Sequence, residues 1–340
     1  MTEAEFIAAL RTLPLHPGAA GLFDDAATLA PGGDTLVFST DSMVEGVHFP
    51  ADMAPADVAW RLVACALSDL AAKGAEPVGV MLNYPLRVEE GRSASPPAHR
   101  SPAKAGAQLR ATANKGVPEI TAAIATGPRP SPGNGPDETW DTAFLHGLTS
   151  ALTHFAAPLL GGDTVSIPPQ APRVLTLTAI GRATHTPVPV RSGAQAGDLL
   201  YVTGSIGAAL LGFERPETEP NAYRRPIARI ADGIALARQV SAMMDVSDGL
   251  LLDAWRMAAA STLAVGIALD AVPIPPELAA DRLRAATWGD DYQLLFALPP
   301  GVVPAVAATC VGVFALGSGL TLSDAGVAVP LPERLGYQHG

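Results

Sequence analysis

The sequence predicts an α/β protein of the α+β kind, built from two domains that each mix strands and helices. Short apolar runs of strand length alternate with longer segments of helical periodicity along most of the chain. The chain has 340 residues, 48% of them apolar, which is enough for two domains with substantial cores. A connection rich in proline and glycine, at 181–198, divides the chain into expected domains at 1–181 and 182–340.

The first domain is predicted from segments with regular apolar spacing. Residues 55–73 place Val58, Leu62 and Cys65 on one helical face, and Gly74 is positioned to end this helix. Further elements are expected around it, namely strands at 34–41 and 77–82, a helix at 139–155, and an apolar run at 159–164 that leads into a Gly-Gly-Asp-Thr turn.

The second domain is predicted from the same two patterns, with strands that are short and rich in apolar residues. The expected strands lie at 174–180, 199–203, 242–246, 265–269, 294–298 and 311–316, and the expected helices at 227–240, 250–259 and 302–308. Strand 174–180 completes the first domain.

A compositional break interrupts the first domain at 91–136. This segment holds eight prolines, almost no large apolar side chains, and six basic residues against one acidic residue. Such a composition cannot bury enough surface to offset the entropy lost on ordering. We therefore expect a disordered insertion between the second strand and the helix that follows.

The net charge, the N-terminal residues and the cysteines indicate which classes of partner and which compartment to expect. The net charge of −11 argues against nucleic-acid binding, and an acidic protein that handles phosphates would need metal ions beside them. The chain lacks a membrane-length apolar run, and its first residues, where Thr2 and Glu5 fit a helix cap, do not form a signal peptide. Cys65 and Cys310 are expected to be buried thiols in the reducing cytoplasm.

Polar chemistry concentrates in six short aspartate clusters, most of them in turns or at strand ends. Aspartate and glycine also form ordinary turns, but six clusters flanked by apolar strands favour several Mg²⁺ sites built from different loops. The clusters are Asp24-Asp25, Thr40-Asp41, Ser68-Asp69, Gly161-Gly162-Asp163-Thr164, Asp245-Val246-Ser247-Asp248-Gly249 and Gly289-Asp290-Asp291-Tyr292.

Other catalytic signatures are missing. The sequence has no Walker A loop, no protein-kinase signature, no nucleophile elbow and no zinc-type spacing. Arg191 is the best candidate for an arginine that contacts phosphate, although a solvated loop arginine is the alternative. His48 follows the Thr40-Asp41 cluster and is a candidate substrate contact, although a lone histidine is often structural.

Taken together, the clusters resemble the thiamine-monophosphate kinase family. The resemblance lies in 40–49 (Thr-Asp-Ser-Met-Val-Glu-Gly-Val-His-Phe), 67–75 (Leu-Ser-Asp-Leu-Ala-Ala-Lys-Gly-Ala), 161–164, 245–250 and 289–292, which match the family's blocks in order. It covers nearly the whole chain outside 91–136. It implies a two-domain fold like that of aminoimidazole ribonucleotide synthetase and a homodimer paired through the N-terminal sheets.

The resemblance also implies roles for individual residues. It makes Asp41, Asp69, Asp163 and Asp245 the catalytic aspartates. The implied metal ligands are Asp25, Ser39, Thr40, Asp41, Asp69, Asp163, Asp245 and Asp248; the implied ATP contacts are Gly162, Asp163, Arg191 and Ser247; and the implied contacts to thiamine phosphate are His48, Asp290 and Tyr337. The chain departs from the family at Phe23, where glycine is frequent, and at Asp290 and Gln293, where glutamate is frequent.

The implied activity is direct, in-line transfer of the γ-phosphoryl group of ATP to thiamine monophosphate with several Mg²⁺ ions. The acceptor phosphate is already ionised near neutral pH, which agrees with a sequence that shows many carboxylates and no evident catalytic base. Two alternatives stay open at this point: another ATP-using synthetase of the same superfamily, and an inactive nucleotide-binding scaffold. Neither a membrane nor a nucleic acid is an expected partner.

Overall fold

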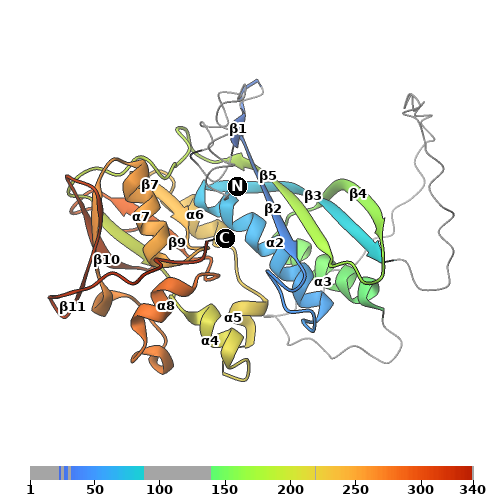
Figure 1. Ribbon diagram of the computed structural model, residues 1–340. Helices are drawn as coiled ribbons and strands as arrows, with labels where there is room; N and C mark the ends of the chain where they lie inside the picture. Colours follow the sequence, from blue (N-terminus) through green and yellow to red (C-terminus); the bar gives the residue numbers. More distant parts are fainter. Residues whose placement is uncertain (1–22, 24–26, 30–31, 88–138, 219, 339–340) are drawn as a thin grey trace.

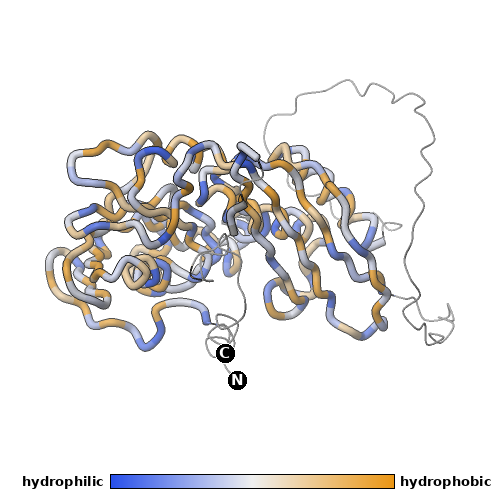
Figure 2. The backbone as a smooth tube through the Cα atoms, turned by 90° about the horizontal axis from the view of Figure 1, so that it is seen from above, coloured by the Kyte–Doolittle hydropathy of each residue, from blue (hydrophilic) through white to orange (hydrophobic). Residues whose placement is uncertain are grey.

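The computed structural model describes residues 23, 27–29, 32–87, 139–218 and 220–338. The expected helix at the N-terminus and the expected insertion at 91–136 lie outside these residues. The described chain forms two lobes that lie side by side, each built around one sheet (Figures 1 and 2).

The first lobe contains a five-stranded sheet in the order β1-β2-β5-β3-β4. Its only parallel pair among these strands is β3 with β4. The strands are β1 (Ala27–Leu29), β2 (Leu36–Val44), β3 (Ala75–Arg87), β4 (Leu159–Ile167) and β5 (Val174–Ala183).

Two helices cover one face of this sheet, α2 (Pro55–Ala72) and α3 (Trp140–His154) (Figure 1). Alternation along β2 buries Val37 and Met43 against α2 and leaves Thr40 and Ser42 exposed on the other face. Helix α3 approaches α2 closely at Gly147, because a Cβ there would lie 2.2 Å from the carbonyl oxygen of Ala56.

The second lobe contains a seven-stranded sheet in the order β12-β11-β8-β10-β6-β9-β7. It is antiparallel except for the pair β8 and β11. The strands are β6 (Leu199–Thr203), β7 (Ala242–Asp245), β8 (Ala264–Ala268), β9 (Leu294–Leu298), β10 (Ala308–Ala315), β11 (Gly319–Asp324) and β12 (Val327–Val329).

Helices of the second half of the chain pack on both lobes. Helix α7 (Leu250–Ala260) covers the second sheet, and α6 (Ile230–Leu236) packs against the end of α2. The remaining helices are α4 (Ala208–Glu214), α5 (Pro220–Arg224), α8 (Arg282–Trp288) and two 3-10 turns at Leu269–Ala271 and Pro276–Leu278.

Helix α2 lies between the two sheets and belongs to both cores. Its first turns pack in the core of the first lobe, which also takes in Tyr223 and Tyr292 from the second half of the chain. Its last residues, Ala71 and Ala72, pack instead with Phe296 and other residues of the second sheet. Side chains on one face of α2 are therefore held against the second lobe.

The mixed fold class predicted from the sequence is confirmed, and the strands at 199–203 and 294–298 have the expected bounds.

The prediction of a helix at 302–308 is wrong. That segment is a loop that leads into β10, because Pro304 disfavours a helical conformation at Val303 and the amide of Ala305 donates to Gln239. The Gly-Gly-Asp-Thr segment lies inside strand β4 rather than in a turn. Cys65 is buried as expected, whereas Cys310 is exposed.

None of the helices in the described parts of the chain is long and apolar enough to cross a membrane.

Candidate functional site

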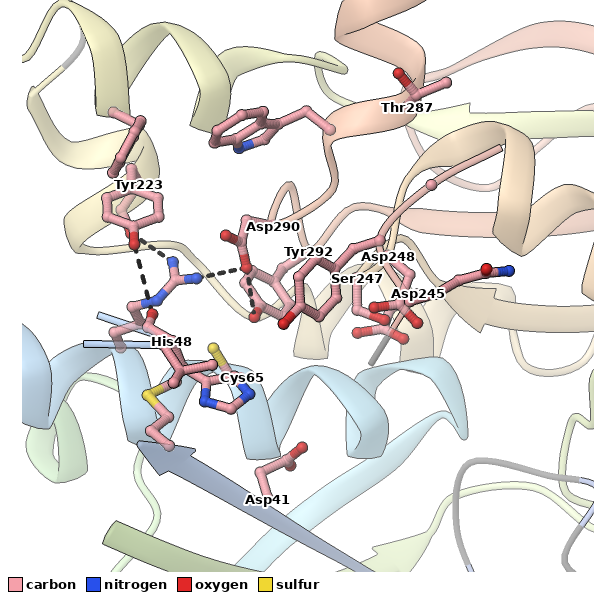
Figure 3. Close-up of a pocket in the computed structure, with 18 of the residues that line it drawn as sticks. Asp41, His48, Cys65, Tyr223, Asp245, Ser247, Asp248, Thr287, Asp290 and Tyr292 are labelled. Carbon is pink, nitrogen blue, oxygen red and sulfur yellow. Dashed lines mark hydrogen bonds and ion pairs between the residues drawn. The ribbon is translucent and has the colours of Figure 1, made fainter. Parts of the chain in front are cut away.

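A pocket of about 840 Å³ lies between the two lobes. The first lobe contributes residues from β2, from the loop after it and from α2, and the second lobe contributes the loops around 245–248, 287–292 and 334–338 (Figure 3). It therefore brings together four of the aspartate clusters found in the sequence.

Three aspartates from three elements share one end of the pocket: Asp41 of β2, Asp69 of α2 and Asp245 of β7. Two serines orient two of these aspartates. Ser39 donates to the carboxylate of Asp69, and Ser68 donates to that of Asp245 at 2.7 Å. We call these three aspartates the acid cluster.

Asp245 is buried, Asp41 and Asp69 are half-buried, and the negative charges of the three carboxylates repel one another. Burial, with the nearby charge of Asp245, raises the pKa of Asp41 to about 7. Burial also raises the pKa of Asp69, and the charges of Asp41 and Asp245 add to that rise. One oxygen of Asp41, Oδ2, is buried without a hydrogen-bond partner in the described structure. An unpartnered carboxylate oxygen among like charges suits a bound cation.

Within the described residues, no three carboxylate, imidazole or thiolate groups converge closely enough to form a complete metal site. Mg²⁺ is usually held by one or two carboxylates, with water and substrate phosphate completing the shell. The acid cluster fits that manner of binding better than it fits a cage made of protein ligands alone.

The loop after β7 carries Ser247 and Asp248 into the pocket. It is anchored by Asp253 of α7, a fully buried carboxylate that accepts hydrogen bonds from the amides of Ser247 and Asp248 at 3.2 and 3.0 Å. Arg256 then bridges the side chains of Asp248 and Asp253. The contacts with Asp253 and Arg256 thus fix the position of Asp248 at the pocket wall.

Main-chain hydrogen bonds join this loop to two others. The amides of Asp290 and Tyr292 donate to the carbonyls of Ser247 and Val246, at 2.7 and 2.8 Å. The amide of Tyr337 donates to the carbonyl of Asp248 at 2.8 Å. Three loops that are far apart in sequence therefore form one wall of the pocket.

Arg61 links the two sides of the pocket. This α2 arginine has only 2% of its surface exposed, and its Nη2 donates to Oδ1 of Asp290 at 2.5 Å (Figure 3). Its Nη1 donates to the carbonyl of Tyr223 at 2.7 Å, and its guanidinium lies 4.3 Å from the centre of the Tyr223 ring.

The other end of the pocket is aromatic. Phe213 contacts both Tyr223 and Trp288, with ring centroids 5.0 and 5.4 Å apart. His48 also lines the pocket, and its Nδ1 accepts from the amide of Val44 at 3.1 Å, so its proton is carried on Nε2. The pocket thus has an acidic end and an apolar, aromatic end.

The structure brings most of the sequence-predicted site residues together. Asp41, His48, Asp69, Asp245, Ser247, Asp248, Asp290 and Tyr337 all line this pocket, and Ser39 contacts Asp69 from behind it.

Four predicted residues lie away from the pocket, and a fifth is not described. Thr40 is on the opposite face of the sheet, where its hydroxyl pairs with Thr178 at 2.8 Å. In the pairing of β3 with β4, Asp163 lies beside Asn83, on that same exposed face, and Gly162 precedes it. Arg191 lies in the connection between the lobes, where its charge acts on Asp245. Asp25 lies outside the described residues.

Sequence reasoning missed the residues that support the predicted ones. Arg61 falls on the same apolar helix face as Val58 and Cys65. A charged residue at such a position could have indicated a buried ion pair. Asp253 follows three leucines in the same way. The aromatic residues gave no signal, because their helices and loops meet only in the folded chain.

Comparisons with known proteins extend over nearly the whole chain. Residues 23–116 and 109–183 match the N-terminal domain of AIR synthase related proteins, and residues 195–313 match the C-terminal domain. A thiamine-monophosphate kinase of Caulobacter vibrioides is 33% identical, in an alignment that covers 100% of this chain and 91% of that protein.

Solved structures share the fold. A thiamine-monophosphate kinase from Stenotrophomonas maltophilia is 27% identical with a TM-score of 0.65, over 96% of both chains. A structure described as AaThiL complexed with AMPPCP and TMP has a TM-score of 0.73 over 100% of this chain and 97% of that one, at 22% identity.

Proposed function

The chain belongs to the thiamine-monophosphate kinase family of AIR synthase related proteins, and we propose that it transfers the γ-phosphoryl group of ATP to thiamine monophosphate. The products are thiamine diphosphate and ADP. The observation that carries this proposal is one pocket with three carboxylates at one end, those of Asp41, Asp69 and the buried Asp245, and aromatic rings at the other.

The acidic end suits the phosphates. Several Mg²⁺ ions, when bound, would neutralise charge on the transferring phosphoryl group and on the acceptor phosphate. Asp41, Asp69, Asp245 and Asp248 are the residues that would hold them, with Ser39 orienting Asp69. The unpartnered oxygen of Asp41 supports this assignment.

The aromatic end suits the organic part of the acceptor. The thiazolium ring of thiamine is cationic, and flat cations are attracted to aromatic faces and carboxylates. Tyr223, Trp288 and Asp290 supply such groups, and Tyr337 stands at the same wall. His48 lines the same pocket, and we assign it a contact to the acceptor.

The chain's own residues act by holding and orienting. Phosphate oxygens are ionised near neutral pH, so the nucleophile needs no general base, and in-line positioning accounts for the remaining work. The Ser247-Asp248 loop is already fixed by Asp253 and Arg256, so its geometry does not need to form during the reaction.

The nucleotide contacts stay predictions. Ser247 lines the pocket, and the charge of Arg191 reaches Asp245, which favours a role for both near the ATP phosphates. Gly162 and Asp163 lie on edge strand β4, outside the pocket lining. A role for them in binding ATP or metal rests on the family resemblance alone.

Product identification tests the proposal. The purified protein is incubated with ATP, Mg²⁺ and, separately, thiamine monophosphate, thiamine and purine-pathway acceptors, and the products are identified by mass spectrometry. Thiamine diphosphate from thiamine monophosphate is the expected result, and Asp41→Asn is the inactive control. Preference for another acceptor would point to a different synthetase, and absence of any ATP turnover would point to a scaffold.

We further infer a homodimer and a cytoplasmic location. The outer face of the first sheet carries Thr40, Ser42, Thr176 and Thr178 in register and is not covered by any described helix. Exposed apolar side chains border it, among them Met81 and Val174. Such a face is suited to pairing with a second copy, which light scattering would detect.

The cytoplasmic location is inferred from the free thiol of the exposed Cys310, which favours a reducing compartment.

A further inference from the structure

Lys73 is a buried lysine behind the acid cluster. It follows the last residue of α2, and only 1% of its surface is exposed. A lysine at the end of a helix usually extends into water, where it interacts favourably with the helix dipole. The complete burial of Lys73 therefore requires a different explanation, because an ammonium group is costly to remove from water without a partner.

The end of α2 fixes the position of Lys73. Its amide donates to the carbonyl of Leu70 at 3.1 Å, and the next residue, Gly74, has a positive φ of 58°. A Cβ at Gly74 would lie 2.4 Å from that of Ala237, and one at Gly233 would lie 1.9 Å from the carbonyl of Ala71. Because α6 presses so closely on this turn, the Lys73 side chain starts from a rigid anchor.

From this anchor Lys73 acts on two members of the acid cluster. Asp69 lies four residues earlier on α2, the spacing and order in which an acidic and a basic side chain attract each other. The Asp245 carboxylate lies at the same turn of α2, because it accepts from the Ser68 hydroxyl at 2.7 Å, and the positive charge of Lys73 acts on both carboxylates. Lysine is otherwise scarce in this arginine-rich chain, and its compact ammonium fits a tight site better than a guanidinium would.

We propose that Lys73 is a positioning residue, a fixed cation that balances part of the charge of Asp69 and Asp245 and so holds the acid cluster together before a divalent cation binds. The proposal rests on the proposed function only for the identity of that cation, Mg²⁺. In this proposal Lys73 offsets part of the negative charge of the acid cluster at all times, and the bound metal offsets the rest.

Thermal unfolding in EDTA tests the charge balance without any need for activity. Lys73→Met keeps the length and the apolar stem but removes the charge. If Lys73 served only as buried packing, this variant would be equally stable or more stable. We expect instead that its melting temperature falls by about 5 °C or more.

A second variant separates charge from folding defects. In Lys73→Met/Asp245→Asn the unbalanced carboxylate is also removed, so we expect the double variant to melt higher than Lys73→Met alone. If Lys73→Met is too unstable to purify, recovery of a folded double variant gives the same result. A double variant no more stable than Lys73→Met, or a Lys73→Met protein as stable as wild type, would overturn the proposal.

Added Mg²⁺ provides an independent readout. Because the metal supplies the missing positive charge, we expect it to raise the melting temperature of Lys73→Met more than that of wild type. Equal increases would show that Lys73 does not share in the charge balance. If Mg²⁺ shifts neither protein, the metal part of the proposed function fails, while the comparison in EDTA still decides the role of Lys73.

Discussion

Arg61 and Asp290 form an ion pair between the two lobes, with Nη2 and Oδ1 2.5 Å apart, although 229 positions separate them in the sequence. The arginine is almost completely buried, whereas the carboxylate of Asp290 is 31% exposed toward the pocket. Asp290 can therefore hold the buried charge and still present an oxygen to a substrate. Its backbone has a positive φ of 62°, a conformation that the Ser247 carbonyl helps to hold by accepting the Asp290 amide.

The first prediction follows from this pair. Asp290→Asn leaves the guanidinium of Arg61 buried without its countercharge, and we expect the free energy of unfolding to fall by about 2–3 kcal/mol. This is less than for a fully buried pair, because water reaches Asp290. Urea unfolding measures the loss, and the KM for thiamine monophosphate is expected to rise.

Asp290→Glu is the matched control for this prediction. It keeps the charge, and glutamate is frequent here in the family that the sequence resembles, so both stability and KM are expected to stay near wild type. Equal losses in the two variants would mean that side-chain size rather than charge matters at this position.

The second prediction concerns the acid cluster. Asp41→Asn and Asp69→Asn each remove a negative charge at the end of the pocket where we place the phosphates. We expect each to lower kcat at saturating Mg²⁺ by about 100-fold or more, since lost metal stabilisation is worth several kcal/mol. Asp324→Asn, at an exposed position at the end of β11, is the surface control. Near-normal kcat in both cluster variants would remove the acid cluster from the catalytic site.

The sequence was informative where a local pattern decides the structure. The helix at 55–73 was predictable because its apolar spacing, its initial proline and its terminal glycine all agree, and the aspartate clusters marked most of the pocket. The placement of Asp163 was not predictable, because a Gly-Gly-Asp-Thr sequence suits a turn as well as a strand. Pairing with β3 decides the matter here: a Cβ at Gly162 would lie 1.9 Å from the carbonyl of Leu82.

Long-range contacts account for the other omissions. Lys73 looked like an ordinary helix end, and only the packing of α6 against α2 reveals its burial. Helices α4, α5 and α8 are short, and they are held by tertiary contacts such as the Asp291 carboxylate, which accepts from the amides of Gly207 and Ala209. No local pattern encodes such a contact.

The third prediction uses the burial of Asp291. Burial raises its pKa to about 7, although hydrogen bonds from Gly207 and Ala209 act in the opposite direction. In the unfolded chain this carboxyl titrates near pH 4, so between pH 4 and 7 the folded state binds more protons. The stability that Asp291 contributes is therefore present at low pH and is lost as the pH rises through about 7.

Urea unfolding in EDTA at pH 5, 6 and 7 measures this effect. The free energy of unfolding of wild type is expected to decline with pH more steeply than that of Asp291→Asn, by on the order of 2 kcal/mol over the range. The comparison concerns the slope, because the amide also changes the hydrogen bonds to Gly207 and Ala209. Asp324→Asn should keep the wild-type slope, and parallel lines for wild type and Asp291→Asn would contradict the prediction.

The last prediction concerns the segment 91–136, whose composition lacks the apolar residues needed for a core. Its two flanks meet in one set of contacts. The Tyr84 hydroxyl donates to Asp141 at 2.5 Å, and the Arg173 guanidinium lies 3.8 Å from the centre of the Trp140 ring. Arg87, close to where the segment begins, donates to the carbonyl of Ala171 at 2.8 Å. The flanks are thus held together by residues outside the segment.

We therefore expect that replacing 91–136 with a short Gly/Ser linker leaves a folded protein with kinase activity close to that of wild type. Closing a shorter loop costs less entropy, and each halving of loop length is worth only about 0.6 kcal/mol, so the free energy of unfolding should change little. A second variant, with a Gly/Ser segment of the original length, separates the effect of length from that of sequence. If both variants lose activity while remaining folded, residues of 91–136 themselves contribute to the site. If only the short-linker variant unfolds, the flanks need the longer span to reach their contacts around Tyr84 and Trp140.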